Sequence, residues 1–222
     1  MNKFKYLILV FLFSSISFAE FKLTQIISPP TESENLNFQS LAISNLDDIY
    51  LLEISNHELY RFDFSGQLIN KSGGFGWEKY NLNQPADICI NSGLNVLVAD
   101  KNNHRLVRFD KNINYITTFP DANTGVELYY PIDIEITKDG VIFILQENNF
   151  EILKLNPDNN SFDIIGENVK KEFQLIEPLD IFLTKNEELF VLEKSGKILS
   201  FDRYGTPLRI WKKPELTFTG RK

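Results

Sequence analysis

The chain is organised around residues 84–119, which read QPADICINSGLNVLVADKNNHRLVRFDKNINYITTF. Apolar runs of four to six residues alternate in this stretch with short clusters of Asn, Asp and Gly. Such spacing is typical of short antiparallel strands joined by tight turns, and it lacks the period of an amphipathic helix. Residues 84–119 therefore predict four strands in hairpin order.

The same unit recurs along the chain. A Pro-x-Asp-Ile motif opens it at Pro85, Pro131 and Pro178, with a period of 46–47 residues. Four strands at this period are the signature of a β-propeller blade, because a four-stranded sheet buries both apolar faces only by stacking on neighbouring sheets. We expect an all-β propeller with four recognisable four-stranded blades, at about residues 38–75, 84–120, 130–166 and 177–212.

Polar positions follow the same period. The two histidines, His57 and His104, occupy equivalent turns, where a hairpin hydrogen bond is favoured over catalysis. The second strand of each unit is expected to end on an acidic residue that accepts turn N–H groups. These acidic residues are Glu53, Asp100, Glu147 and Glu193.

The second unit resembles a known repeat. Its segment VADKNNHRL (residues 98–106), preceded by Pro85 and followed by Phe109 and Asp110, looks like the NHL repeat. The resemblance extends over about residues 40–211 and implies a propeller of a kind that commonly has six blades. Because propellers host binding modules, scaffolds, lyases and lactonases, the resemblance predicts the architecture and not a ligand.

The two ends of the chain lie outside the four units. Residues 1–19 combine a basic start, a short apolar run and small residues before a cleavage point, which predicts a secretory signal peptide. Residues 21–27 alternate like a strand, and we expect them to close a blade within a propeller domain at residues 20–222. The alternatives are a closed four-bladed ring, a five-bladed ring with a hybrid blade, and an incomplete larger ring.

Composition narrows the classes of partner. The 222 residues carry a formal net charge of -7 and show no basic stripe, so a nucleic-acid partner is not expected. No stretch beyond the signal peptide is long and apolar enough to span a bilayer. We therefore expect a secreted or periplasmic protein without a membrane contact after signal cleavage. The single cysteine, Cys89, lies in an apolar strand and is predicted to be buried and unreactive.

Three aspartates provide a candidate metal site. Asp87, Asp133 and Asp180 each begin the innermost strand of a unit, and innermost strands line the axis of a propeller. Three carboxylates at one channel mouth would suit a hard cation such as calcium. The alternative, favoured by the equivalence of the three positions, is that each carboxylate binds backbone N–H groups at a blade junction.

Aromatic residues between the units provide a candidate ligand-binding site, formed by Trp77, Tyr80, Tyr129 and Tyr130. Loops held by a rigid scaffold commonly carry binding residues, although the same aromatic residues would also fill seams between blades. The favoured function is an exported binding or scaffold module for a protein, peptide or glycan, without a cofactor. The alternative is a calcium-dependent enzyme, lactonase-like or lyase-like, with its carboxylates at the axis.

Overall fold

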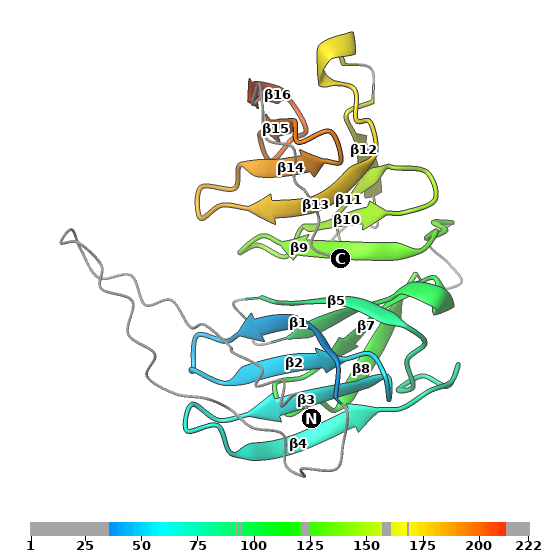
Figure 1. Ribbon diagram of the computed structural model, residues 1–222, viewed down its shortest axis with the longest axis vertical. Helices are drawn as coiled ribbons and strands as arrows, with labels where there is room; N and C mark the ends of the chain where they lie inside the picture. The colour runs from blue at the N-terminus through cyan, green and yellow to red at the C-terminus, as the bar shows by residue number, and fades with distance from the viewer. Residues whose placement is uncertain are drawn as a thin grey trace, which may run out of the picture.

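The computed structural model describes residues 36–91, 93, 95–120, 125–156, 161–167 and 169–211. This part of the chain folds into four four-stranded antiparallel sheets, each built from consecutive strands (Figure 1). The prediction of an all-β propeller architecture with four blades is therefore confirmed. The predicted signal peptide and the predicted closing strand at residues 21–27 lie outside the described residues.

Each blade runs in order from its innermost to its outermost strand. Blade 1 comprises β1 (Phe38–Ile43), β2 (Ile49–Glu53), β3 (Glu58–Phe62) and β4 (Leu68–Gly73). Blade 2 comprises β5 (Pro85–Ile90), β6 (Val96–Asp100), β7 (Arg105–Phe109) and β8 (Tyr115–Phe119). Blade 3 comprises β9 (Pro131–Ile136), β10 (Ile142–Gln146), β11 (Ile152–Asn156) and β12 (Ser161–Ile165). Blade 4 comprises β13 (Pro178–Leu183), β14 (Leu189–Glu193), β15 (Ile198–Phe201) and β16 (Pro207–Trp211).

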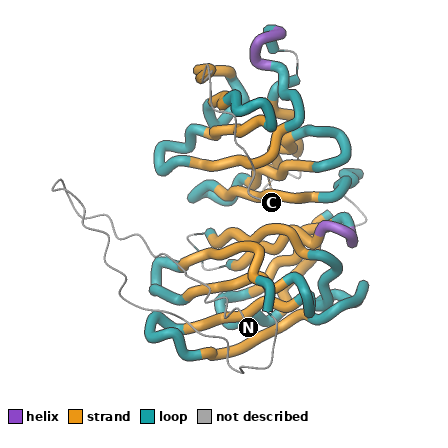
Figure 2. The backbone as a smooth tube through the Cα atoms, viewed as in Figure 1, coloured by secondary structure: helices purple, strands orange, loops and turns teal. Residues whose placement is uncertain are grey.

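Asp and Gly residues close the turns between the third and fourth strands. Asp63, Asp110 and Asp202 each accept backbone N–H groups through Oδ1, for example from Thr206 to Asp202 at 2.8 Å. Gly205 follows Asp202 with φ of 89°, a left-handed conformation that glycine adopts without a steric penalty. These side chains take over hydrogen bonds that the turn backbone would otherwise leave unmade. Figure 2 shows the resulting short strands with loops at both ends of each sheet.

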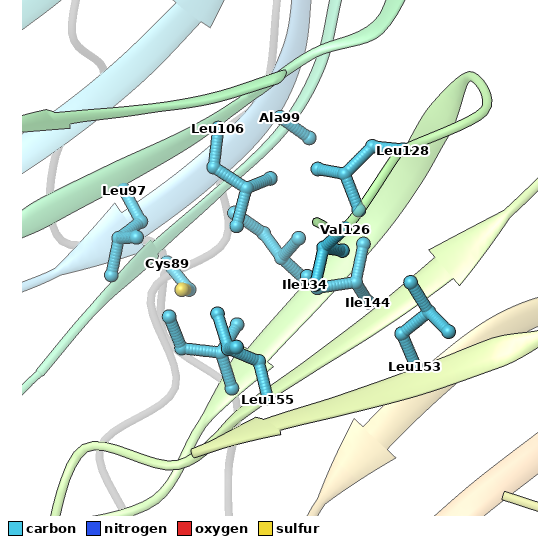
Figure 3. Packing of buried hydrophobic residues seen from close by; sticks show 11 residues of the cluster. Cys89, Leu97, Ala99, Leu106, Val126, Leu128, Ile134, Ile144, Leu153 and Leu155 are labelled. Carbon is cyan, nitrogen blue, oxygen red and sulfur yellow. The ribbon is translucent and has the colours of Figure 1, made fainter. Parts of the chain in front are cut away.

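The blades are held together by apolar seams. The second strands of blades 2 and 3 are buried on both faces, because alternate side chains point to opposite sides of a sheet and each side meets a neighbouring blade. The seam between blades 2 and 3 is shown in Figure 3. Its fully buried members include Ala99, Ile144 and Ile134, at 0–1% exposure. Comparable clusters fill the seam between blades 1 and 2 and the seam between blades 3 and 4.

The innermost strands β1, β5, β9 and β13 lie around one groove at the axis, which we call the axial groove. Its lining includes Asp87, Asp133 and Asp180. Each connection between blades leads from an outermost strand to the innermost strand of the next blade. Two short 3-10 turns, η1 (Lys101–Asn103) and η2 (Lys171–Phe173), complete the described elements. Within the described ranges, no helix has the length and apolar character required to cross a membrane.

Candidate functional site

The connection from blade 1 to blade 2, residues 74–84, carries exposed aromatic side chains, and we call it the aromatic loop. Phe75, Trp77 and Tyr80 are 59%, 72% and 49% exposed. The Trp77 ring meets the edge of Phe75 at 5.7 Å between centroids, and Phe75 contacts His57 at 5.2 Å. Burial of such rings is a dominant favourable term in protein cores and interfaces, so their exposure marks this loop as a candidate contact surface.

A buried carboxylate anchors the aromatic loop. Asp100, at the end of β6, is fully buried and accepts the backbone N–H of Asn83 at 2.6 Å. It also accepts hydrogen bonds from Asn103 Nδ2 at 2.8 Å and from Arg105 Nε at 2.7 Å. Burial raises the pKa of Asp100, while these three donors act in the opposite direction. A carboxylate with this many donors is a fixed point for the chain that leads into blade 2.

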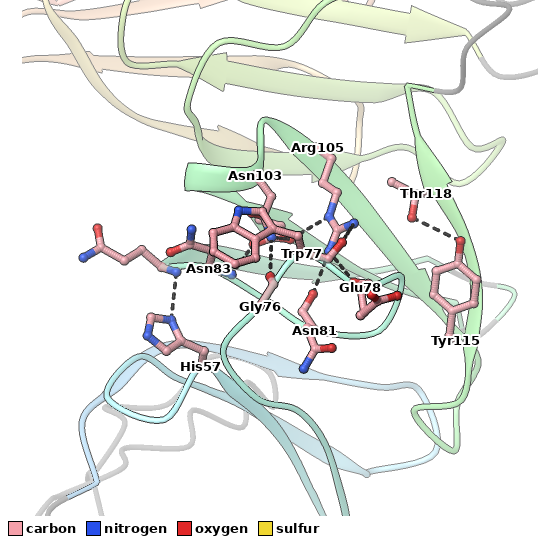
Figure 4. Close-up of polar contacts among 12 residues, drawn as sticks. His57, Gly76, Trp77, Glu78, Asn81, Asn83, Asn103, Arg105, Tyr115 and Thr118 are labelled. Atoms are coloured by element: carbon pink, nitrogen blue, oxygen red, sulfur yellow. Dashed lines mark hydrogen bonds and ion pairs between the residues drawn. The ribbon is translucent and has the colours of Figure 1, made fainter.

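Arg105 extends the anchor across the aromatic loop (Figure 4). Its Nη1 donates to the carbonyl oxygen of Trp77 at 3.2 Å, and its Nη2 donates to those of Glu78 and Asn81 at 2.9 and 2.7 Å. One guanidinium thus binds a carboxylate and three carbonyl groups, which its planar array of five N–H donors allows. The backbone that carries Trp77 is consequently held in place although its side chain faces solvent.

The two histidines bind the following connection and not their own hairpin. His57 Nδ1 accepts the backbone N–H of Gln84 at 2.8 Å, and His104 Nδ1 accepts that of Tyr130 at 3.3 Å. The expectation of a structural role agrees with this geometry, but the hydrogen bond joins one blade to the start of the next. The sequence did not reveal this partner, because it lies 26–27 residues further along the chain.

The remaining predicted binding residues fall into two groups. Tyr129 is 38% exposed in the second connection, and its hydroxyl makes a short hydrogen bond to Glu127, which raises the pKa of Tyr129. Tyr130 is half-buried and packs on His104 at 4.3 Å between ring centroids. Trp77, Tyr80 and Tyr129 are therefore available to a ligand, whereas Tyr130 fills a seam, the alternative considered for all four.

One position of the predicted acidic series is wrong. The buried residue at the end of β10 is Gln146, whose Oε1 accepts the N–H of Tyr129 at 2.6 Å as Asp100 accepts that of Asn83. Glu147 lies one residue beyond the strand, and its 53% exposed side chain pairs with Lys101. The prediction followed charge and chose Glu147, one residue too far along the chain, since only the position inside the strand reaches the buried N–H.

The axial aspartates connect successive blades. Asp87 accepts the hydroxyl of Ser40 at 2.6 Å through Oδ1 and the backbone N–H of Ile134 at 2.9 Å through Oδ2. Asp133 Oδ2 accepts the N–H of Ile181 at 2.7 Å. These contacts are those of the blade-junction alternative, because Asp87 and Asp133 each bind the innermost strand of the next blade, whereas Asp180 lies beside Asp133.

The axial groove has a volume of about 530 Å³ and gathers four carboxyl groups, from the three predicted aspartates and Glu135. Burial, followed by the neighbouring Asp180 and Asp87, raises the pKa of Asp133 to about 9. Burial also raises the pKa of Glu135 to about 7. Asp133 is therefore protonated at neutral pH and can donate a hydrogen bond. Sequence reasoning missed Glu135, which sits two residues after Asp133 on the same face of β9 and accepts the N–H of Leu183.

The groove brings the three predicted metal ligands to one place without arranging them as a ligand set. Across the described part of the chain, no group of three or more His, Cys, Asp or Glu side chains is placed to hold a metal ion. Asp87 and Asp133 already accept hydrogen bonds from backbone N–H groups through oxygen atoms that a calcium ion would need. The residues present do not fit a resident calcium ion, and the calcium site stays a prediction.

Comparison with known proteins supports the fold. Residues 82–109 match the model of the NHL repeat, so the resemblance seen in the second unit is confirmed there. No protein with curated annotation matches the chain. Virginiamycin B lyase from Staphylococcus aureus, solved with quinupristin, is similar with a TM-score of 0.59 and 15% identity, over 83% of this chain and 58% of the lyase. The chain thus spans less than two thirds of that relative.

Two further solved structures are similar. A protein of unknown function from Bacteroides caccae gives a TM-score of 0.61 at 14% identity, over 84% of this chain and 70% of the other. The extracellular domain of a putative one-component system from B. thetaiotaomicron gives 0.60 at 13% identity, over 80% of this chain and 24% of the other. At these identities the likeness establishes the propeller fold alone.

Proposed function

We propose that this chain is an exported NHL-type β-propeller module that binds a protein, peptide or glycan through the aromatic loop. The observation that carries the proposal is Trp77, which is 72% exposed while its own carbonyl oxygen is held by Arg105. A large aromatic side chain on a fixed backbone loses little conformational entropy when a ligand covers it. Such a loop is already arranged for binding.

Neighbouring residues support the same surface. Phe75 and Tyr80 extend the apolar area, and Lys79 lies over the ring of Tyr115 at 5.5 Å. Polar and charged groups at the margin would orient a ligand whose apolar face covers Trp77. Export rests on the signal-peptide pattern of residues 1–19, and the similarity to an extracellular domain is consistent with it.

A binding screen tests the proposal. The purified chain would be applied to a glycan array and to a peptide array, in parallel with Trp77→Ala and with Phe64→Ala. Phe64 is 57% exposed in a turn of blade 1, so it controls for the loss of any exposed aromatic group. We expect a signal that Trp77→Ala reduces at least tenfold and Phe64→Ala leaves unchanged. Equal signals from the three proteins, or none on either array, would contradict the proposal.

An enzyme remains the second candidate, on the strength of the axial groove. A carboxyl group protonated at neutral pH beside ionisable neighbours is a common arrangement for general acid catalysis. In an enzyme of this kind Asp133 would donate a proton, and Asp180 or Glu135 would accept one. The chain would be assayed against simple lactones and against quinupristin, with and without calcium. Turnover that Asp133→Asn abolishes without loss of folding would favour the enzyme, and no turnover under any condition would eliminate it for these substrates.

A further inference from the structure

Two histidines hold the chain where it enters blades 2 and 3. His57 Nδ1 accepts the backbone N–H of Gln84 at 2.8 Å, and His104 Nδ1 accepts that of Tyr130 at 3.3 Å. Gln84 and Tyr130 each precede the proline that opens an innermost strand. A ring nitrogen accepts a hydrogen bond only through its lone pair, so both contacts require a neutral imidazole with its proton on Nε2.

The position of each ring is fixed by the surrounding structure. The carbonyl oxygen of His57 accepts the N–H of Gly74 at 2.8 Å, and the His57 ring contacts Phe75. The His104 ring packs edge-on against Tyr130 at 4.3 Å between centroids. Protonation adds a second N–H to the ring, at Nδ1, which then faces the backbone N–H. Because two donors cannot form a hydrogen bond with each other, a ring held in this position loses its contact when it becomes charged.

Charged groups on the surrounding elements do not favour the protonated rings. The carboxylates of the hairpins and connections beside the two histidines already have partners. These are Glu53 with the N–H groups of Ser55 and Asn56, Glu58 with Lys71, Asp100 with Arg105, Glu127 with the hydroxyl of Tyr129, and Glu147 with Lys101. Glu78 of the aromatic loop lies on the far side of Trp77 from His57 (Figure 4). Among the described residues, an ion pair therefore does not offset the loss of the backbone contact.

The connection to blade 4 provides a reference within the same chain. Glu177 corresponds to Gln84, and the two residues adopt positive φ angles of 47° and 48°. Phe150 stands at the histidine position of blade 3, so no imidazole is offered to the N–H of Glu177. The backbone thus takes the same conformation before a strand whether or not its N–H meets a group that can change charge.

We infer that His57 and His104 form an acid-sensitive latch on the connections into blades 2 and 3. An ordinary histidine changes charge between about pH 5 and pH 8, so acidification over this range releases the N–H groups of Gln84 and Tyr130. Gln84 is the last residue of the aromatic loop, and His57 therefore controls how firmly the loop is joined to blade 2. The effect on ligand binding rests on the function proposed above, because a looser loop loses more conformational entropy when a ligand covers it.

Amide hydrogen exchange tests the latch without a ligand. Protection factors of the N–H groups of Gln84, Tyr130 and Glu177 would be measured by NMR at pH 8 and pH 5, each relative to the intrinsic exchange rate at that pH. We expect the protection of Gln84 to fall about tenfold at pH 5, that of Tyr130 to fall less because its contact is longer, and that of Glu177 to stay constant. This readout is local, whereas Asp133 and Glu135 of the axial groove act on the stability of the whole chain.

His57→Asn is the matched variant. The asparagine Oδ1, like the histidine Nδ1, is attached to Cγ and can accept the N–H of Gln84, but the amide does not titrate. Asparagine also tolerates the positive φ of 59° at this position. We expect the fall at Gln84 to disappear in this variant, while Tyr130 still responds through His104. Equal protection of Gln84 at both pH values in the wild type would overturn the latch. So would a fall that persists in His57→Asn, which would assign the effect to Asp100.

The consequence for binding is measured separately. The glycan and peptide arrays would be read at pH 8 and pH 5 with the wild type and with His57→Asn. We expect the wild-type signal to drop between the two pH values by a larger factor than the signal of the variant. Equal factors would contradict the regulatory role of the latch. A pH-dependent protection of Gln84 without any array signal would contradict the proposed function and leave the latch in place.

Discussion

The connection into blade 2 and the connection into blade 4 differ in how the chain is held where it enters the sheet. In the connection to blade 2, Asp100, Arg105 and His57 together bind the aromatic loop. In the connection to blade 4, Glu193 accepts the N–H of Ile176 at 2.8 Å, in the same manner as Asp100. The remaining contacts are weaker, because Lys197 reaches only one carbonyl group of the connection, that of Gln174 at 3.4 Å.

The histidine contact is also missing in the connection to blade 4. Phe150 stands where blades 1 and 2 have His57 and His104, and all three residues adopt a positive φ of 53–59°. The backbone path is therefore retained while the side-chain contact is lost. The difference indicates that the repeat by itself fixes the path of the chain into each sheet. Among the extra contacts, those of Asp100, Arg105 and His57 hold the loop that carries Trp77, whereas that of His104 holds the connection to blade 3.

The largest effect expected from this comparison is that of removing Arg105. Arg105→Ala leaves Asp100 as a buried carboxylate without its cation and frees three carbonyl groups, so we expect a loss of about 3–5 kcal/mol in the free energy of unfolding. Lys197→Ala is the equivalent change in blade 4. Lys197 pairs with the buried Glu193 at the longer distance of 3.2 Å and binds only one carbonyl group, so we expect a smaller loss of about 2–3 kcal/mol. Urea denaturation of both variants checks the comparison. Equal losses would mean that both connections are held equally well.

The axial junction between blades 3 and 4 predicts a pH dependence. Since the pKa of Asp133 is raised to about 9 in the folded state, the folded protein keeps a proton that the unfolded chain releases. The contribution of Asp133 to the free energy of unfolding is therefore fully present below about pH 4, the ordinary pKa range of the carboxyl group, and it is lost as the pH rises towards 9. Glu135, with a pKa of about 7, acts in the same direction.

Asp133→Asn should remove most of this dependence. The amide cannot ionise but still accepts the N–H of Ile181 through its oxygen, so we expect it to be more stable than the wild type by about 1–3 kcal/mol at pH 8. Asp133→Ala controls for the lost hydrogen bond and should gain less. Denaturation series between pH 4 and pH 9 distinguish the variants. A wild type that becomes more stable as the pH rises over this range would contradict the assigned direction.

A smaller effect follows from exchanging the residues at the histidine position. His57→Phe removes the acceptor of the Gln84 N–H and should cost about 0.5–1.5 kcal/mol. Phe150→His offers Nδ1 to the third connection, in a backbone conformation that matches that of His57, and should gain up to about 1 kcal/mol. Thermal melting at pH 8, where an ordinary histidine is neutral, measures both. A loss of stability in Phe150→His would show that the chain follows a different path into blade 4.

The smallest effect on stability is expected for Trp77→Ala. The side chain is 72% exposed, and Arg105 contacts the backbone of Trp77, which alanine retains. The free energy of unfolding should change by no more than about 0.5 kcal/mol. A larger loss in chemical denaturation would place Trp77 among the groups that hold the loop and weaken its assignment to a ligand.

The period of the sequence was sufficient to predict the four blades and their strand order. Apolar residues alternate with polar ones in strands whose length matches the repeat, so the buried faces follow from local pattern. The same reasoning placed Asp87 and Asp133 at the axis and favoured a junction contact, because equivalent residues meet equivalent neighbours. The one wrong position has a local cause as well. The sequence pattern does not show that β10 ends at Gln146 and leaves Glu147 outside the strand.

The candidate site could not be predicted as fully. Arg105 contacts carbonyl groups 24–28 residues earlier in the chain, and the sequence contains no signal for a side chain that binds backbone atoms at that distance. The raised pKa of Asp133 depends on burial and on two further carboxyl groups from neighbouring blades. Such properties arise only when the sheets are assembled, because desolvation and charge proximity depend on tertiary contacts.

The way in which the aromatic loop is anchored has a consequence for variation of its sequence. Asp100, His57 and Arg105 bind backbone groups, so the side chains at Trp77, Glu78 and neighbouring positions are not needed to fix the path of the chain. Different side chains can therefore occupy these positions at little cost to folding. A lineage of such proteins would be able to change what it recognises by a few substitutions at the tip of one loop, and a protein engineer would be able to diversify the same positions as a library.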